Sequence, residues 1–200
     1  MNKILLDLPN KIITPRLILR HPQAGDGQEV FNAISDGYED VVKWMNQPEK
    51  IPPIEYFEAE VRRSHALWIL RSDIRFVITD KETDNIIGIG LYPPCQANWN
   101  IPSFGIMYFL AKTYQRKGYA TEAVNALIRF AFKHLKARKI EIKCDEENVK
   151  SIAIPERLGM QLEASQKGLW PRNDKEGLAT VRTYAIFNTE ILPELEVHYG

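Results

Sequence analysis

One stretch of this sequence, residues 104–135, constrains the fold more than any other. It begins with the apolar and aromatic run 104–110, which is typical of a strand. A short loop containing Gly118 follows, and after it apolar residues recur at helical spacing, which predicts an amphipathic helix. The apolar face of this helix comprises Ala120, Ala123, Val124, Leu127, Ile128, Ala131 and Leu135, and the opposite face carries Glu122, Asn125, Arg129 and Lys133.

The loop and the start of the helix, Gln115-Arg-Lys-Gly-Tyr-Ala120, have the features of an anion site. The backbone amides from Arg116 to Ala120 have no partner within the helix, and the helix dipole adds positive charge there. Gly118 and Ala120 are small enough to let phosphate groups approach the backbone. A purely structural helix start is the alternative, and the short motif alone does not separate the two. The flanking strand and the long helix favour the phosphate site.

The rest of the sequence predicts strands and helices of one α/β domain over residues 10–190, followed by a tail at 191–200. Asp26 and Glu29 form a capping-box pattern at the start of a helix that reaches Ile34. Residues 165–177 are expected to form a polar loop. The other expected elements are strands at 16–20, 74–79, 86–92, 139–144, 160–164 and 180–187, a helix at 54–70, and a helix that is capped by Asn148 or Ser151 and ends at Gly159.

Charge and composition argue against several kinds of site. The chain has 26 basic and 26 acidic residues, so its net charge gives no reason to expect nucleic-acid binding. No apolar run approaches the roughly 20 residues of a membrane helix, and the first residues do not form a signal peptide. The two cysteines are expected to be free thiols of a cytoplasmic protein, and the four histidines lack the spacing of metal ligands.

The charges are distributed unevenly along the chain. Residues 112–143 contain nine Lys or Arg and two acids, whereas residues 21–60 contain nine acids and two Lys. One interpretation is that both segments are solvated helix faces. The other is a basic half around the phosphate site and an acidic half that attracts a cationic ligand.

Residues 115–123, Gln-Arg-Lys-Gly-Tyr-Ala-Thr-Glu-Ala, resemble the acyl-CoA-binding motif of the GNAT N-acetyltransferases. Two further segments resemble the branch that contains the ribosomal-protein N-terminal (alanine/serine) acetyltransferases. Ile13-Thr-Pro-Arg-Leu-Ile-Leu-Arg20 is similar to the opening strand of that branch, and Asn148-Val-Lys-Ser151 with Ile154-Pro-Glu-Arg-Leu-Gly159 is similar to its later helix. The three segments occur in the order of the family and span most of the chain.

The resemblance implies a single GNAT-like domain with a mixed, mostly antiparallel sheet that is flanked by helices and split near Phe109–Ala111. Asn148 would contact the cofactor and Ser151 would protonate the departing thiolate, although helix capping alone is the alternative for both. The positions at which the family often has a carboxylate base are Gly105 and Leu169 here, so a water-relayed proton path is expected. The implied acetyl-CoA contacts are Phe109, Leu110, Ala111, Gln115, Arg116, Lys117, Gly118, Tyr119, Ala120, Thr121 and Asn148.

Three functions are consistent with these features. The first is an acetyl-CoA-dependent N-acetyltransferase that needs no metal and acts on the N-terminal α-amine of a protein. The second is the same reaction on a small cationic amine such as a polyamine or aminoglycoside. The third is a non-catalytic acyl-CoA-binding module. The acidic half favours a cationic acceptor. Neither nucleic acid nor a membrane is an expected partner. The sequence leaves open whether the protein forms a homodimer.

Overall fold

The computed structural model describes residues 2–45, 47–172 and 176–200. Its helices are α1 (Gly27–Ser35), α2 (Tyr38–Met45), α3 (Ile54–Ile69), α4 (Tyr119–His134) and α5 (Val149–Arg157), with 3-10 turns η1 (Lys3–Leu5), η2 (Pro94–Gln96) and η3 (Lys112–Tyr114). Its strands are β1 (Lys11–Ile13), β2 (Leu17–Arg20), β3 (Ile74–Asp80), β4 (Ile86–Tyr92), β5 (Ala97–Asn98), β6 (Ser103–Gly105), β7 (Met107–Leu110), β8 (Lys139–Asp145), β9 (Gln161–Pro171), β10 (Leu178–Ile186) and β11 (His198–Tyr199).

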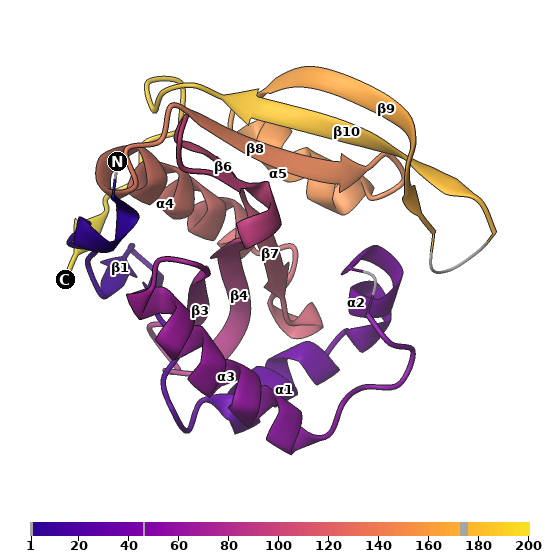
Figure 1. The fold of residues 1–200 in the computed structure, drawn as a ribbon. Coiled ribbons are helices and arrows are strands. Elements are labelled where there is room, and N and C mark those ends of the chain that lie inside the picture. The colour runs from indigo at the N-terminus through magenta and orange to yellow at the C-terminus, as the bar shows by residue number, and fades with distance from the viewer. Residues whose placement is uncertain (1, 46, 173–175) are drawn as a thin grey trace.

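The strands form two sheets that splay apart (Figure 1). The first sheet has the order β11-β1-β2-β3-β4-β7, and its neighbouring strands are antiparallel. The second has the order β5-β6-β8-β10-β9, in which β6 and β8 run parallel and the other pairs antiparallel. The result is the mixed, mostly antiparallel architecture with flanking helices that the resemblance implied.

Helices cover both faces of the first sheet, α1 and α3 on one side and α4 on the other (Figure 1). The alternation along β3 shows this arrangement. Phe76 and Ile78 belong to the main core together with the apolar face of α4, whereas Val77 between them packs with Val30 of α1 and Val61 of α3. Because successive side chains of a strand point to opposite faces, a strand buried on both sides reads as a continuous apolar run.

The chain passes from one sheet to the other at Ile106. β6 pairs with β8 up to Gly105, and the Ile106 amide still donates to the Glu141 carbonyl at 2.8 Å. β7 then pairs with β4 as far as Leu110. The single strand predicted at 104–110 is therefore two strands, and the split of the sheet begins before Phe109. It leaves one edge of β7 facing the space between the sheets.

The polar loop predicted at 165–177 is wrong over its first half, because β9 runs on to Pro171. β9 pairs with β10 from Gln161 opposite Ala185 to Pro171 opposite Leu178, with two register shifts. It is the outer strand of its sheet, and most of its side chains are exposed. An edge strand that is solvated on both faces needs no apolar alternation, so its sequence is typical of a loop. Figure 1 shows the resulting hairpin extending beyond the rest of the molecule.

Two smaller expectations also change. Asp26 precedes α1, but its side chain makes no helix cap. The Arg20 guanidinium takes the carboxylate instead, with N···O distances of 2.7 and 2.8 Å. Residues 191–200, predicted to be a tail, return to the first sheet: Leu192 is buried, and β11 pairs with β1 through Tyr199 opposite Ile12.

Candidate active site

The loop before α4 has the backbone conformation of an anion cradle. Arg116 and Gly118 both have positive φ angles, of 62° and 82°. Gly118 is the N-cap of α4, and a Cβ there would lie 3.3 Å from Arg16 Nη2 as well as in a left-handed conformation. Because a glycine has no side chain with which to cap the helix, the first amides of α4 are left to bind an anion.

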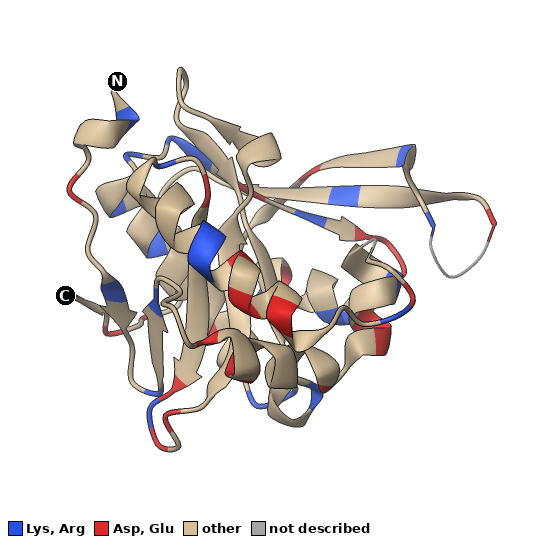
Figure 2. Ribbon diagram, turned by 60° about the horizontal axis from the view of Figure 1, so that its bottom comes forward, with Lys and Arg blue, Asp and Glu red and all other residues tan. Residues whose placement is uncertain are grey.

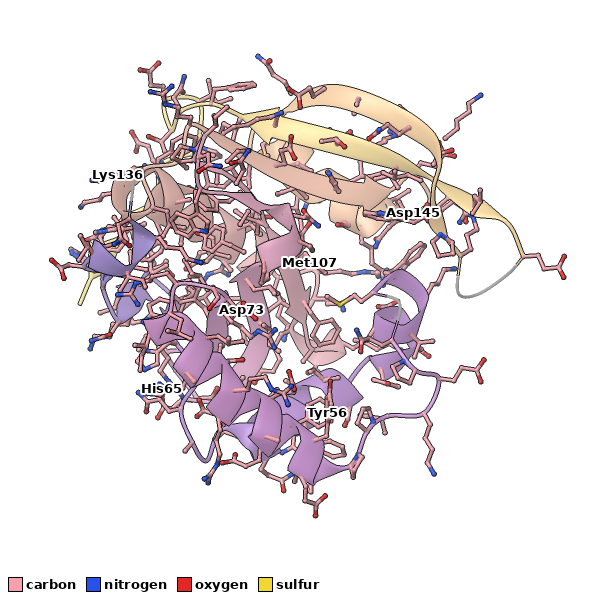
Figure 3. The ribbon with its side chains drawn as sticks, in the orientation of Figure 1. Tyr56, His65, Asp73, Met107, Lys136 and Asp145 are labelled. Carbon is pink, nitrogen blue, oxygen red and sulfur yellow. The ribbon has the colours of Figure 1, made fainter. Side chains whose placement is uncertain are left out.

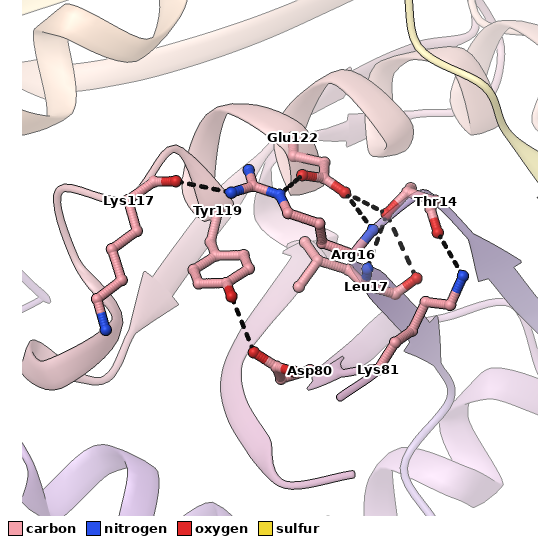
Figure 4. Close-up of polar contacts among 8 residues, drawn as sticks. All are labelled: Thr14, Arg16, Leu17, Asp80, Lys81, Lys117, Tyr119 and Glu122. Carbon is pink, nitrogen blue, oxygen red and sulfur yellow. Dashed lines mark hydrogen bonds and ion pairs between the residues drawn. The ribbon is translucent and has the colours of Figure 1, made fainter. Parts of the chain in front are cut away.

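A buried carboxylate anchors this cradle from behind (Figure 4). Glu122, in the first turn of α4, accepts hydrogen bonds from Thr14 Oγ1 at 2.7 Å, from the Arg16 amide at 3.0 Å and from Arg16 Nε at 2.6 Å. Arg16 Nη1 in turn donates to the carbonyl of Lys117 in the cradle at 2.9 Å. The turn between β1 and β2 thus fixes the position of the loop.

The polar face predicted for α4 is therefore packed rather than solvated near its start. Glu122 is buried by the contacts just described. Asn125 is buried one turn later and donates from Nδ2 to the Pro193 carbonyl at 2.9 Å. Polar side chains can be buried at both positions because each makes hydrogen bonds with polar groups inside the fold.

The cradle opens into a cavity of about 550 Å³, called the cofactor cavity below, between the end of β7, the start of α4 and α5. Asp40 and Trp44 of α2 and Ser151 of α5 also contribute to its wall. Of the cofactor contacts implied by the sequence, those that line it are Phe109, Leu110, Gln115, Arg116, Gly118, Ala120, Thr121 and Asn148.

The other three implied contacts, all within the described residues, do not line this cavity. Ala111 is buried, and its amide donates to the Ile87 carbonyl at 2.9 Å. The Lys117 carbonyl accepts the bond from Arg16, and the Tyr119 hydroxyl donates to Asp80 Oδ2 at 3.0 Å (Figure 4). These residues contribute to the support of the cradle.

The Ser151 hydroxyl is within hydrogen-bond distance of two other side chains. Its Oγ is 3.0 Å from the Tyr108 hydroxyl of β7 and 3.2 Å from Cys144 Sγ of β8. Burial raises the pKa of the Tyr108 hydroxyl well above its usual value, and it raises the pKa of the Cys144 thiol to about 11. Both groups are therefore protonated at neutral pH, and either can donate to Ser151.

The two capping candidates for α5 have different roles. Asn148 is the N-cap, and its Oδ1 accepts from the Ser151 amide at 3.1 Å. The Ser151 hydroxyl is directed to Tyr108 and Cys144 instead. Pro155 is accommodated inside the helix, and Gly159 follows its end with a φ of 72°.

The open edge of β7 presents backbone groups to the same cavity. The Ala111 amide bonds to β4, and successive residues of a strand direct their amides to opposite sides. The Leu110 amide therefore points away from β4, toward the space between the sheets. The Leu110 carbonyl shares this side and accepts from Gln115 Nε2 at 3.1 Å.

Neither position at which the family often has a carboxylate base carries one here. Gly105 is buried, and a Cβ there would lie 2.0 Å from Gln96 Oε1. Leu169 lies on the exposed strand β9. Asp145 lines a neighbouring cavity but is paired with Arg172 at 3.3 Å.

The acidic half of the sequence does not form a separate acidic face. Acidic and basic segments are interspersed along the ribbon (Figure 2). Glu39 pairs with Lys112 at 2.5 Å and Asp40 with Lys150 at 3.5 Å, so two of the nine acids at 21–60 pair with bases of the second half. Attraction of a cationic acceptor by these acids stays a prediction.

Several other features bear on cofactors and environment. Among the residues that the structure describes, no group of three or more His, Cys, Asp or Glu is placed to hold a metal ion. Cys95 and Cys144 are free thiols. Within the same residues, no helix combines the length and apolar character needed to cross a bilayer.

The sequence model of a family described as "Acetyltransferase (GNAT) domain" matches residues 16–161. The chain belongs to the GNAT family. It is an acetyltransferase of the GNAT type, and the sheet split at β7 is the fold of that family.

Relatives of this GNAT protein carry the same general name. The uncharacterized N-acetyltransferase p20 of Bacillus licheniformis is 32% identical over 160 residues, which cover 76% of this chain and 83% of that protein. The uncharacterized N-acetyltransferase YnaD of Bacillus subtilis (strain 168) is 26% identical over 164 residues, or 82% and 90% of the two chains. The ribosomal L7/L12 alpha-N-protein acetyltransferase RimL, solved with coenzyme A, has a similar fold, with a TM-score of 0.79 and 18% identity over 88% of this chain and 97% of that chain.

Sequence reasoning missed the parts of this GNAT site that tertiary contacts create. Tyr108 appeared only as one aromatic of a strand, and Cys144 only as one of two thiols, although both contact Ser151. Glu122 appeared as part of a solvated face. A pattern within one element contains no signal for such contacts, because each joins residues from different elements.

Proposed function

We propose that this GNAT acetyltransferase transfers the acetyl group of acetyl-CoA to the N-terminal α-amine of a protein. The cofactor cavity carries the proposal, because one continuous space is lined by the amide cradle at Gly118, by the edge of β7 and by Ser151. RimL supports the choice of acceptor, since it has a similar fold and is named for the α-amine of a ribosomal protein.

The residues that line the cavity fit a phosphate-bearing cofactor. The free amides from Gly118 to Ala120 and the Arg116 side chain would hold the phosphates, and Gln115 and Thr121 would border them. Asn148 uses Oδ1 to cap α5, and its amide nitrogen is left to contact the ligand. When bound, acetyl-CoA supplies the acetyl group as an activated thioester.

Transfer forms a bond between the acceptor nitrogen and the acetyl carbon and breaks the bond from that carbon to sulfur. The Leu110 amide stabilises negative charge on the acetyl oxygen. Ser151 donates its hydroxyl proton to the departing sulfur and regains a proton from water, while Tyr108 orients the hydroxyl. The proton of the acceptor nitrogen passes to water, because neither Gly105 nor Leu169 supplies a carboxylate.

The acid–base demand of the reaction favours an α-amine. An α-amine has a pKa near 8, whereas a lysine amine has one near 10.4, so more of the α-amine is neutral at pH 7. The ion pairs of Glu39 and Asp40 leave fewer unpaired acids to attract a small cationic amine. A cytoplasmic location is part of the proposal, because both cysteines are free thiols.

The release of free CoA from acetyl-CoA tests the proposal. The acceptors are short peptides with a free N-terminus, the same peptides with a blocked N-terminus and a free lysine, and a polyamine. We expect CoA release only with the free N-termini, and the acetyl group on the first residue by mass spectrometry. Release with the polyamine alone would replace the proposed acceptor, and release with none would contradict turnover of these amines.

A further inference from the structure

A second cavity, of about 290 Å³, lies between the helical layer of α1, α2 and α3 and the first sheet. We call it the acceptor cavity. It is bordered by a small apolar cluster that is separate from the main core and contains Val30, Phe57, Val61 and Val77. The cavity is partly open to solvent, and concave, mostly apolar surfaces of this kind are where small ligands and side chains of partners bind.

The acceptor cavity meets the cofactor cavity at β7. Phe109 and Met45 line both of them. Met107, earlier on the same strand, lines the acceptor cavity and the cavity that contains Asp145. In Figure 3, Met107 lies between Tyr56 of α3 on one side and Asp145 of β8 on the other. A group in the acceptor cavity is thus adjacent to the strand along which the acetyl group would lie.

The wall of the acceptor cavity is mainly apolar. Ile34, Val41, Ile89 and Leu91 line it together with residues of the small cluster. Its two charged residues have ion-pair partners, Glu60 with Arg63 and Arg75 Nη2 with Asp73, whereas Arg75 Nε is buried without a hydrogen-bond partner among the described residues. An apolar group in the cavity would remove apolar surface from water.

The volume limits what can enter. Small-molecule sites usually measure about 300–1,000 Å³, so a cavity of about 290 Å³ lies at their lower limit and has room for one large side chain. Resting on the proposed function, we infer that this cavity binds the side chain of the residue that carries the reacting amine. The acceptor is therefore an N-terminus whose first residue is large and apolar, such as leucine or phenylalanine, rather than alanine or serine.

Two peptides that differ only in their first residue, leucine or serine, test this inference. Burying a leucine side chain should raise kcat/KM by about 10- to 100-fold over serine, because the gain follows the apolar area removed from water. The measurement is CoA release at subsaturating peptide and saturating acetyl-CoA. Equal rates, or faster release with serine, would overturn the inference and leave the proposed function intact.

Changes to the cavity wall should move the preference in opposite directions. Val61→Phe fills part of the cavity, so the preference for leucine over serine should fall below about threefold. Val61→Ala enlarges the cavity, so the best first residue should shift from leucine toward tryptophan. A general loss of stability would lower the rates with both peptides and leave their ratio unchanged, which would also overturn the inference.

Ile34→Trp provides a second filling variant if Val61→Phe does not fold. Ile34 is only partly buried on α1, so the larger ring can be tolerated. The acetyl-CoA-induced rise in Tm shows in each variant that the cofactor cavity is intact. CoA release with neither peptide would contradict the proposed function and this inference together, whereas release without a leucine preference would contradict only the inference.

Discussion

The cofactor cavity and the acceptor cavity share β7, yet they are built in different ways. A single segment from Gln115 to Thr121 supplies the phosphate-binding end of the first, where backbone amides are the main binding groups, and α5, β7 and α2 complete its wall. The second is made of side chains from α1, α2, α3, β3, β4 and β7. A site built from local backbone tolerates sequence change as long as its glycine is kept, whereas a site built from distant side chains changes its ligand with each substitution.

Ser151→Ala tests the reacting end of the cofactor cavity and should have the largest effect. We expect kcat to fall about 10- to 1000-fold, with little change in acetyl-CoA affinity, because the acid toward the leaving sulfur is lost. Alanine keeps the amide that Asn148 caps and the Ser151 carbonyl to which the Tyr108 hydroxyl also donates, so the loss of stability should be limited to about 1 kcal/mol. Ser165→Ala on exposed β9 is the matched control, and equal kcat values for the two variants would show that Ser151 is not the acid.

Gly118→Val should abolish acetyl-CoA binding and leave the acceptor cavity unchanged. The left-handed conformation of Gly118 suits a branched residue poorly, so the cradle should shift. Acetyl-CoA at about 100 times Kd stabilises a protein by about 2.7 kcal/mol, and this stabilisation should disappear in the variant. Gly25→Val is the control, since Gly25 also has a positive φ, of 101°, and a Cβ there meets nothing within 4 Å. An undiminished Tm shift in Gly118→Val would place the cofactor elsewhere.

Arg16→Met tests whether the anchor behind the cradle matters for binding. Glu122 would keep the Thr14 hydroxyl but lose its charged partner, which should cost about 1.5–3 kcal/mol of stability. The acetyl-CoA Kd should rise as well, because the Lys117 carbonyl loses its bond. The control is Arg62→Met, which removes an exposed ion pair with Glu58 and should change stability little. Isothermal titration and chemical unfolding measure both quantities, and unchanged values for Arg16→Met would contradict the anchor.

Asp36 is the C-cap of α1 and accepts hydrogen bonds from Thr113 of η3, so it joins the acceptor-side helices to the segment before the cradle. Replacing it should have the smallest effect of these variants. The Thr113 amide and hydroxyl lower the pKa of its carboxylate through hydrogen bonds of 2.9 and 2.7 Å. A lowered folded pKa adds stability above the unfolded value near pH 4, and this stability is lost as the pH falls through the folded pKa. Because the group is exposed, the difference in unfolding free energy between wild type and Asp36→Asn should be a few tenths of a kcal/mol at pH 6 and vanish near pH 2. A difference independent of pH would show that the carboxylate charge has no role.

The contrast between the two cavities also explains what could be predicted from the sequence. The loop at Gln115–Ala120 was recognisable because its glycine and the following helix are adjacent in the chain. The helices α3 and α4 were predicted because each has its own apolar period, and the strands β3 and β4 because each is a short, largely apolar run. β9 was predicted only at its start, since an exposed edge strand has no such period.

The acceptor cavity was not predictable in the same way. Val30, Phe57 and Val61 are buried in one cluster, but nothing in their spacing along the chain shows that the layer they form is incomplete. The contacts of Ser151 with Tyr108 and Cys144 depend on where β7, β8 and α5 meet. The uneven distribution of charge along the chain did not show which acids and bases are neighbours, because opposite charges far apart in sequence pair across the fold.

The anchor of the cradle has a consequence for the order in which the protein forms during synthesis. Thr14 and Arg16 leave the ribosome early, but Glu122 is 108 and 106 residues further along the chain. At about 5–20 residues per second, those two residues wait roughly 5 to 20 s for their partner. The nascent chain can assemble the helices α1 and α3 during that time, but not the cradle. We expect the ability to bind acetyl-CoA to arise abruptly and late in translation, after the acceptor-side helices have formed.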